Sequence, residues 1–363
     1  MMVPTYHGAD RTTKARRAAG DTLSLYRMRA GICVLLPVAL LGHACVRPAA
    51  SFECTTSDQC TGGGICQPAG VCSFADADCP SGQRYGAASG DLSGSCVDGT
   101  DRTICDLAKP FGTPVPVAGV TGSGVQDGDL RLSPDEKTAY FFSDRTGALL
   151  LFTAQRTGPT AKFDTPSALA NVNAGNQYNP AISADGRTLF FASFRSTSND
   201  IYQATRASAG DAFTNVRLVP GVNSAESEVQ PYVARDGATM YFVRELAIGK
   251  TVFSAAGSLG AGYANPQPVL ELDGPTNDDD PVISADGMTL YWGSDRPGGA
   301  GDVDVWRATR TSTSAAFGDL APVASVNSSA QDSPSDISSD GCRLYLTSNR
   351  DGRVGIYVAT RPP

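Results

Sequence analysis

The chain has 363 residues, a net charge of −8 and only two histidines, His7 and His43. Residues 1–44 hold six Lys or Arg and two Asp or Glu, so the chain from residue 45 onward carries a net charge of −12. An acidic chain without a basic stripe argues against nucleic-acid binding. Any chain that starts at residue 45 also lacks histidine, which excludes Ser-His-Asp or Cys-His catalysis and histidine-ligated zinc.

Residues 1–44 are predicted to be a signal peptide. Residues 30–41 form an apolar run that is short for a membrane span, and Arg27 and Arg29 supply its positive flank. Met28 is a second candidate for the translation start.

The segment Leu41-Gly-His-Ala-Cys45 resembles a bacterial lipoprotein cleavage site, although Gly42 stands where leucine is usual. This resemblance implies that Cys45 becomes the lipidated first residue, which would anchor the protein to a membrane. The expected location is then the bacterial cell envelope, as an outer-membrane lipoprotein facing the periplasm or the surface. Ordinary secretory cleavage at an alanine-containing site is the alternative.

Residues 45–105 are predicted to form a small cysteine-rich module next to the anchor site. The short segment has almost no hydrophobic run, so disulfides rather than an apolar core should stabilise it. Zinc is the alternative, but no Cys-x-x-Cys pair and no histidine occurs in the module. The seven module cysteines after Cys45 are Cys54, Cys60, Cys66, Cys72, Cys79, Cys96 and Cys105.

Because seven is odd, the remote Cys342 is the expected partner of Cys105. Three bridges would then join the six cysteines from Cys54 to Cys96, in a connectivity that the sequence does not define. In the chain-entropy model, a bond that closes so long a loop stabilises the fold by about 4–5 kcal/mol. The alternative is that Cys342 is a buried free thiol.

Residues 106–363 contain five copies of a unit of about 50 residues. Each copy has four strand-like runs with a tight turn after the first, a size and pattern typical of a β-propeller blade. The anchor aspartates of these turns are predicted to be structural, since every copy has one. They are Asp135, Asp185, Asp236, Asp286 and Asp340.

The last unit ends after its third strand, and the missing fourth strand has a candidate at the front of the propeller. Residues 111–117, Phe-Gly-Thr-Pro-Val-Pro-Val, match the lead of the fourth strand in the other units. We therefore predict an all-β, five-bladed propeller that an N-terminal strand closes, which removes open sheet edges.

The units resemble TolB-like β-propeller repeats, with the best match at residues 281–310. The resemblance rests on Pro-x-Ile-Ser-x-Asp-Gly followed by a bulky strand, Ser-x-Arg and a Gly-rich turn. It implies the fold but no single activity, because members of this family bind proteins, bind glycans or occasionally catalyse reactions. The first unit has Glu136 instead of glycine and the third has Val243-Arg-Glu245 instead of Ser-x-Arg, so irregular turns are expected there.

Acidic residues recur in four units, three positions before the first-strand position that is usually proline and is Leu130 or Ser335 in two units. They are Asp127, Glu228, Asp278 and Asp332. If the first strands line a central channel, these four form an acidic ring at its mouth that could bind a polar or basic partner. Calcium is a candidate cofactor only near Asp278, Asp279 and Asp280, since carboxylates are suitable ligands. The alternative is that the acids cap loops. The arginines Arg145, Arg195, Arg296 and Arg350 are expected to bond these acids rather than bind an anion.

No residue set predicts a catalytic centre, and no other cofactor is expected. The predicted function is therefore an exported, lipid-anchored envelope protein whose propeller binds an envelope protein or a cell-wall glycan. The alternative is a carbohydrate-active hydrolase or lyase that uses carboxylates at the channel mouth. The oligomeric state is not predicted.

Overall fold

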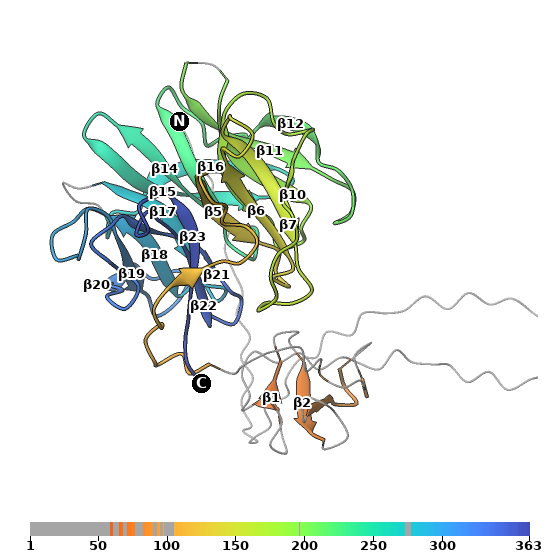
Figure 1. The fold of residues 1–363 in the computed structure, drawn as a ribbon. Helices are drawn as coiled ribbons and strands as arrows, with labels where there is room; N and C mark the ends of the chain where they lie inside the picture. Colours follow the sequence, from red (N-terminus) through yellow and green to blue (C-terminus); the bar gives the residue numbers. More distant parts are fainter. Residues whose placement is uncertain are drawn as a thin grey trace, which may run out of the picture. The chain divides into compact units, whose positions relative to one another are not determined.

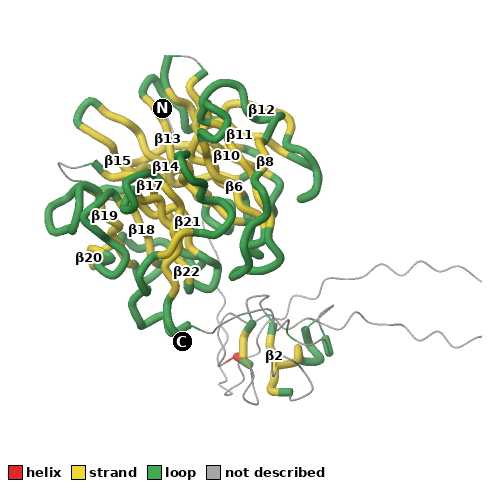
Figure 2. The backbone as a smooth tube through the Cα atoms, in the orientation of Figure 1, coloured by secondary structure: helices red, strands yellow, loops and turns green. Residues whose placement is uncertain are grey.

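The computed structural model describes residues 59–60, 65–67, 71–76, 83–89, 93–94, 97, 105–195, 197–272 and 277–363. Strands and their connecting loops account for almost all of this part of the chain (Figure 2). Within the described residues, no helix has the length and apolar character needed to cross a membrane. The predicted signal peptide and Cys45 lie outside the described residues.

Five four-stranded antiparallel sheets form the blades of a propeller, as predicted (Figure 1). Blade 1 contains β5 (Asp127–Leu132), β6 (Thr138–Ser143), β7 (Leu150–Gln155) and β8 (Ser167–Ala168). Blade 2 contains β9 (Gln177–Ile182), β10 (Thr188–Phe194), β11 (Asn199–Thr205) and β12 (Thr214–Leu218). Blade 3 contains β13 (Ser227–Val233), β14 (Thr239–Leu246), β15 (Gly249–Ser258) and β16 (Gly262–Pro268). Blade 4 contains β17 (Asp278–Ile283), β18 (Thr289–Ser294), β19 (Asp304–Thr309) and β20 (Gly318–Pro322). Blade 5 contains β21 (Asp332–Ile337), β22 (Arg343–Ser348), β23 (Gly355–Thr360) and β4 (Val115–Pro116).

The first strand of each blade contacts the first strands of both neighbouring blades, so β5, β9, β13, β17 and β21 surround a central channel. We call the end of the propeller at which these strands begin the entry face. Because the strands of a blade alternate in direction, the turn between its second and third strands also lies on the entry face. The loop from each fourth strand to the next blade lies there as well.

The fifth blade is completed by the front of the propeller, which confirms the predicted closure. In β4, Val115 and Pro116 pair with Val358 and Tyr357 of β23, and an orange segment lies beside the blue strands in Figure 1. The predicted disulfide between Cys105 and Cys342 is also present, with 5.6 Å between the Cα atoms. A covalent bond therefore joins the first segment of the propeller to its last blade.

The turn after each first strand has the same geometry in all five blades. Each turn aspartate accepts a hydrogen bond from the backbone N–H two residues later, which confirms its structural role. The expected irregular turn at Glu136 is not found. Its φ is 56°, close to the 67° of Gly186 at the same place in blade 2. A left-handed conformation is costly for glutamate, so its side chain must compensate.

The Glu136 side chain provides this compensation at the interface between blades 5 and 1. Its carboxylate accepts hydrogen bonds from Arg343 at 2.7 and 2.9 Å and from the Tyr345 hydroxyl at 2.8 Å, and Arg156 lies 3.5 Å away. All of these partners are buried or nearly so, and Arg343 and Tyr345 belong to blade 5. The residue that breaks the turn pattern thus forms a buried ion pair across the closure of the ring.

Most blade interfaces contain an arginine–tyrosine hydrogen bond between adjacent blades. Arg206 donates to Tyr140 at 2.8 Å, Arg156 to Tyr345 at 3.0 Å and Arg361 to Tyr291 at 3.4 Å. Arg310 bonds Tyr241 in the same way.

The interface between blades 2 and 3 lacks both residues of this bond. Phe190 replaces the tyrosine and Gly257 replaces the arginine. Tyr263 fills the space, with its ring edge-to-face on Phe190 at 6.3 Å and its hydroxyl donating to the Gly237 carbonyl at 3.1 Å. A Cβ atom on Gly257 would lie 2.2 Å from the Gly262 carbonyl oxygen, so there is no room for a side chain at this position.

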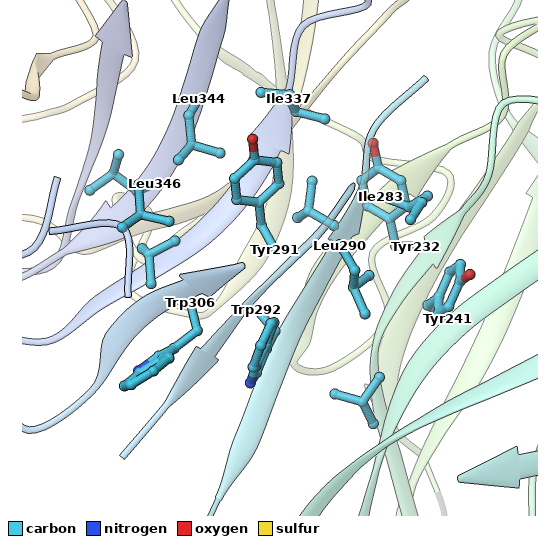
Figure 3. Packing of buried hydrophobic residues seen from close by; sticks show 14 of the residues in the cluster. Tyr232, Tyr241, Ile283, Leu290, Tyr291, Trp292, Trp306, Ile337, Leu344 and Leu346 are labelled. Atoms are coloured by element: carbon cyan, nitrogen blue, oxygen red, sulfur yellow. The ribbon is translucent and has the colours of Figure 1, made fainter. Parts of the chain in front are cut away.

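The core between adjacent sheets is aromatic and aliphatic. Figure 3 shows Trp292 of β18 beside Trp306 of β19, among leucine, isoleucine and tyrosine side chains of neighbouring strands. The alanines two residues after the aromatic position of each third strand are all buried, so small and large residues alternate in the core between sheets. They are Ala154, Ala204, Ala255, Ala308 and Ala359.

The described part of the cysteine-rich module contains the sheet β1 (Ile65–Cys66), β2 (Cys72–Ala75) and β3 (Gln83–Tyr85). A disulfide joins Cys60 and Cys72, as expected for a bridge within the module. Cys54, Cys79 and Cys96 lie outside the described residues.

Candidate functional site

The four acids of the predicted ring lie at the start of the first strands, but they do not face solvent. Asp127, Glu228, Asp278 and Asp332 are each no more than 1% exposed. An arginine pairs with each of them within its own blade: Arg145, Arg244 and Arg296 at 2.7 Å, and Arg350. The charge of the ring is therefore neutralised inside the protein.

Each of these arginines also holds the loop that enters its blade. Arg145 donates to the Val120 carbonyl at 2.8 Å, and Arg296 donates to the Leu272 carbonyl at 2.7 Å. Arg195 keeps the same carbonyl bond in blade 2, where Gln177 replaces the acid. The guanidinium groups lie over aromatic rings of the second and third strands; Arg296, for example, is 4.9 Å from Trp292 and 5.3 Å from Trp306. The acids and arginines thus hold the loops that connect one blade to the next.

Blade 3 reaches the same arrangement with different residues. Arg244 stands in the strand position that serine occupies in the other blades, directly opposite Glu228 in the register. The longer glutamate side chain lets the carboxylate accept from Arg244, while Arg244 still reaches the Val222 carbonyl at 3.0 Å.

Side chains two residues further along the first strands line the channel. Asp129, Asn179, Gln230 and Asp280 have φ values of 48–55° at a bulge in each strand, and all are buried. Asn179 donates to the Asp129 carboxylate at 2.5 Å and accepts from the Gln230 backbone N–H at 3.3 Å. Of these four residues, only Asp280 was singled out from the sequence, as a calcium candidate; the other three lie immediately before the first-strand Pro or Leu.

Carboxylates of blades 1 and 4 share this layer of the channel. Burial, and then the negative charges of Asp129 and Asp279, raise the pKa of Asp280 well above its usual range. Burial also raises the pKa of Asp129 and of Asp279, against the attraction of Arg131 and Lys250 respectively. Lys250 of blade 3 lies 3.4 Å from Asp279. The channel therefore concentrates acids that resist ionisation.

The candidate calcium ligands Asp278, Asp279 and Asp280 do not converge on one point. Asp278 accepts from Arg296 and from the Trp292 indole, whereas Asp279 lies against Lys250. Among the described residues, no group of three or more His, Cys, Asp or Glu side chains has a geometry that could hold a metal ion.

A second layer, deeper in the channel, closes it. The Tyr232 hydroxyl of blade 3 donates to the Asp336 carboxylate of blade 5 at 3.2 Å, and the Arg131 guanidinium of blade 1 lies 5.0 Å from the centre of the Tyr232 ring. The other two blades have Ala181 and Val282 at this position, so these three residues depart from the repeat. The cavity beside them has a volume of about 30 Å³. It can hold a water molecule but not a sugar ring.

Three large apolar side chains are exposed on the entry face at blades 2 and 3. Phe194, at the end of β10, is 54% exposed; Ile248, in the turn between β14 and β15, is 84% exposed; and Leu270, after β16, is 68% exposed. We call these three residues the apolar patch. Scattered apolar residues are common on surfaces, so what distinguishes these three is that they share one face and lie on adjacent blades.

No model of a known protein family matches the sequence, and no curated protein is detectably similar to it. Solved structures similar to the chain include TolB from Acinetobacter baumannii, with 16% identity and a TM-score of 0.42 over 80% of this chain and 60% of that one. A putative TolB from Agrobacterium tumefaciens has 16% identity and a TM-score of 0.41 over 83% of this chain and 90% of that one.

An endo-arabinase from Bacteroides thetaiotaomicron is also similar, with 13% identity and a TM-score of 0.48 over 69% of this chain and 97% of the enzyme. The chain spans only 60% of the length of the Acinetobacter TolB. At these identities the likeness concerns the fold alone, which the strand order of this chain establishes by itself.

Proposed function

We propose that the chain is an exported binding protein whose propeller docks another envelope protein on its entry face, through the apolar patch. The observation that carries this proposal is the exposure of Phe194, Ile248 and Leu270 on adjacent blades. Exposed side chains of this size lose contact with water when a partner covers them, and each fully buried one contributes about 1.5–3 kcal/mol.

The β14–β15 hairpin supports this proposal because it is built differently from its counterparts. Its strands remain paired out to Leu246 and Gly249, so only Ala247 and Ile248 form the turn. The strand pairing therefore holds Ile248 rigidly at the tip, with little entropy left to lose on binding. Nothing within the described residues requires an isoleucine at this exposed position.

A carbohydrate-active enzyme is less well supported. A glycosidase needs two carboxyl groups on either side of a sugar, with an acid whose pKa is raised. Asp280 has a raised pKa, but Tyr232, Arg131 and Asp336 close the channel and leave a cavity of about 30 Å³. The ring acids are paired with arginines.

The two disulfides indicate that the protein is exported, because such bonds persist in oxidising compartments. The finer location belongs to the proposal. Residues 1–44 would direct export and lipidation of Cys45 would anchor the chain, so that the propeller is displayed at the bacterial envelope.

The test is in-cell crosslinking and capture of the full chain, compared with a variant that carries Phe194→Ser, Ile248→Ser and Leu270→Ser. The matched control carries Val115→Ser and Leu320→Ser, which change exposed aliphatic residues elsewhere. We expect specific envelope proteins with the native chain and the control but not with the patch variant. Identical partners for all three would contradict the proposal. Retention on cell-wall polysaccharide that depends on the patch would instead indicate a glycan ligand.

A further inference from the structure

The groove between blades 4 and 5, which we call groove 4/5, is cationic on an acidic protein. It has a volume of about 460 Å³, and its lining includes Lys109, Phe111, Tyr291, Arg307 and Arg361. No Asp or Glu lines it.

In groove 4/5, Arg361 bonds the Tyr291 hydroxyl, and Arg307 is the residue opposite Tyr291 in the strand register. Burial raises the pKa of Tyr291, while the positive charges of Arg361 and Arg307 act against this shift. Arg361 donates to the Tyr291 hydroxyl at 3.4 Å, to the Gly341 carbonyl at 3.1 Å and to the Lys109 carbonyl. These acceptors are all neutral, so they satisfy the donors of Arg361 without cancelling its charge.

Neither Arg307 nor Arg361 is in a salt bridge within the described part of the chain, whereas nine other pairs of charged side chains are. Arg307 is exposed. The Lys109 ammonium already donates to the main-chain oxygen of Pro363. The two arginines therefore carry the positive charge that remains available to a ligand.

The equivalent grooves differ in charge, although they have similar size. Groove 1/2 has a volume of about 420 Å³ and contains Arg206 with Asp211 in its lining. Groove 3/4 has a volume of about 310 Å³, and Asp236 and Asp286 accompany its arginines. Only groove 4/5, of these three, presents cations without a carboxylate.

Arg307 is also a departure from the repeat. The same position of the third strand holds Thr153, Gln203, Ser254 and Val358 in the other blades. Residues that every blade shares serve the blade itself, as the turn aspartates do. An arginine that one blade alone carries, beside a second arginine and a buried tyrosine, is not explained by that architecture.

We propose that groove 4/5 binds the carboxylate of a small ligand, about the size of one sugar or amino-acid unit. Arginine presents donors in a planar fork that matches a carboxylate, and two such groups in one groove give a site for it. The exposed side chains of Leu107 and Pro110 supply an apolar wall for the ligand body. This site shares no residue with the apolar patch and goes beyond the proposed docking function.

The test is calorimetric titration of the purified full chain with two probes, D-glucuronate and N-acetyl-Ala-Ala. Glucose and the amidated dipeptide are the uncharged counterparts. We expect at least one carboxylate to bind and its counterpart not to bind, and the preferred probe identifies an acidic sugar or a peptide terminus as the source. The affinity should fall as salt is added.

The variant Arg307→Gln should weaken binding of that probe about tenfold or more, because a hydrogen bond to a charged group is lost. Arg187→Gln removes the same charge from an exposed turn of blade 2 and should leave binding unchanged. Unchanged affinity in Arg307→Gln would overturn the assignment. So would the absence of binding by both carboxylates at concentrations of order 10 mM. Both variants leave the apolar patch intact, so failure here is separate from failure of the docking proposal.

Discussion

The interface between blades 5 and 1 and the interface between blades 2 and 3 perform the same structural task with opposite chemistry. At the ring closure, Glu136 pairs with Arg343, and a disulfide joins Cys105 to Cys342. Between blades 2 and 3, Phe190 and Tyr263 meet instead, without the arginine–tyrosine bond found elsewhere. The closure brings together distant parts of the chain, so it needs the stronger contacts. The apolar interface lies in the half of the ring that carries the apolar patch.

The largest expected effect is at Glu136. Changing Glu136→Gln leaves the buried Arg156 with no carboxylate and Arg343 with Asp340 alone, so the free energy of unfolding should fall by about 3–5 kcal/mol. Denaturant titration measures this, with Glu271→Gln on the exposed loop as the control. A loss equal to that of the control would show that the ion pair does not stabilise the closure.

The disulfide should have the next largest effect. The double variant Cys105→Ala and Cys342→Ala frees the chain ends in the unfolded state. We expect a loss of about 2–4 kcal/mol, the typical range for a disulfide and below the figure of the chain-entropy model. Thermal unfolding of this variant under oxidising conditions checks the loss without disturbing the Cys60–Cys72 bond. If the melting temperature does not change, the bond is not a constraint on the ring.

The apolar interface between blades 2 and 3 should be destabilised by an added polar group. Phe190→Tyr introduces a hydroxyl where no arginine is available, so we expect a loss of about 1–3 kcal/mol in the free energy of unfolding. The reverse change at a normal interface, Tyr140→Phe, removes the acceptor of Arg206 and should cost about 1 kcal/mol. Equal stability of Phe190→Tyr and the native chain would mean that this interface tolerates polar groups.

A substitution in the channel should have the smallest effect, and it should increase the free energy of unfolding. Burial raises the pKa of Asp280, so its folded carboxyl holds a proton more tightly than the unfolded one. The stability this gives is present at acid pH and is lost as the pH rises through the folded pKa. Asp280→Asn should therefore stabilise the protein at neutral pH, by about 1 kcal/mol. Melting temperatures at several pH values test this, and an Asp280→Asn variant that is less stable at neutral pH would contradict it.

The sequence predicted the blades and the closing strand because both rest on local patterns that repeat. It also placed Asp127 and its equivalents at the start of the first strands, but not their burial. The expected pairing of these acids with arginines is confirmed in blades 1, 4 and 5, but only the folded blade shows that the acids are enclosed. The channel position of Asp129 and Asp280 was not predicted because a bulge turns both residues inward, and strict alternation does not anticipate a bulge.

Exposure is equally hard to read from sequence. Ile248 and Val252 are both aliphatic residues near one turn, yet Ile248 is 84% exposed and Val252 is 1% exposed. Pairing through Leu246 and Gly249 decides this, because it leaves Ile248 at the tip of the hairpin.

Native-state amide hydrogen exchange of the full chain compares the two interfaces most directly. Exchange reports the free energy of local opening, strand by strand. We predict that the free energy of local opening is lower for the amides of β9 and β13 than for those of β5 and β21. The reason is that the interface of β9 and β13 lacks a polar or covalent contact of the kind found at the closure. Equal protection, or faster exchange in β5 and β21, would contradict the view that the ring is held chiefly at its closure.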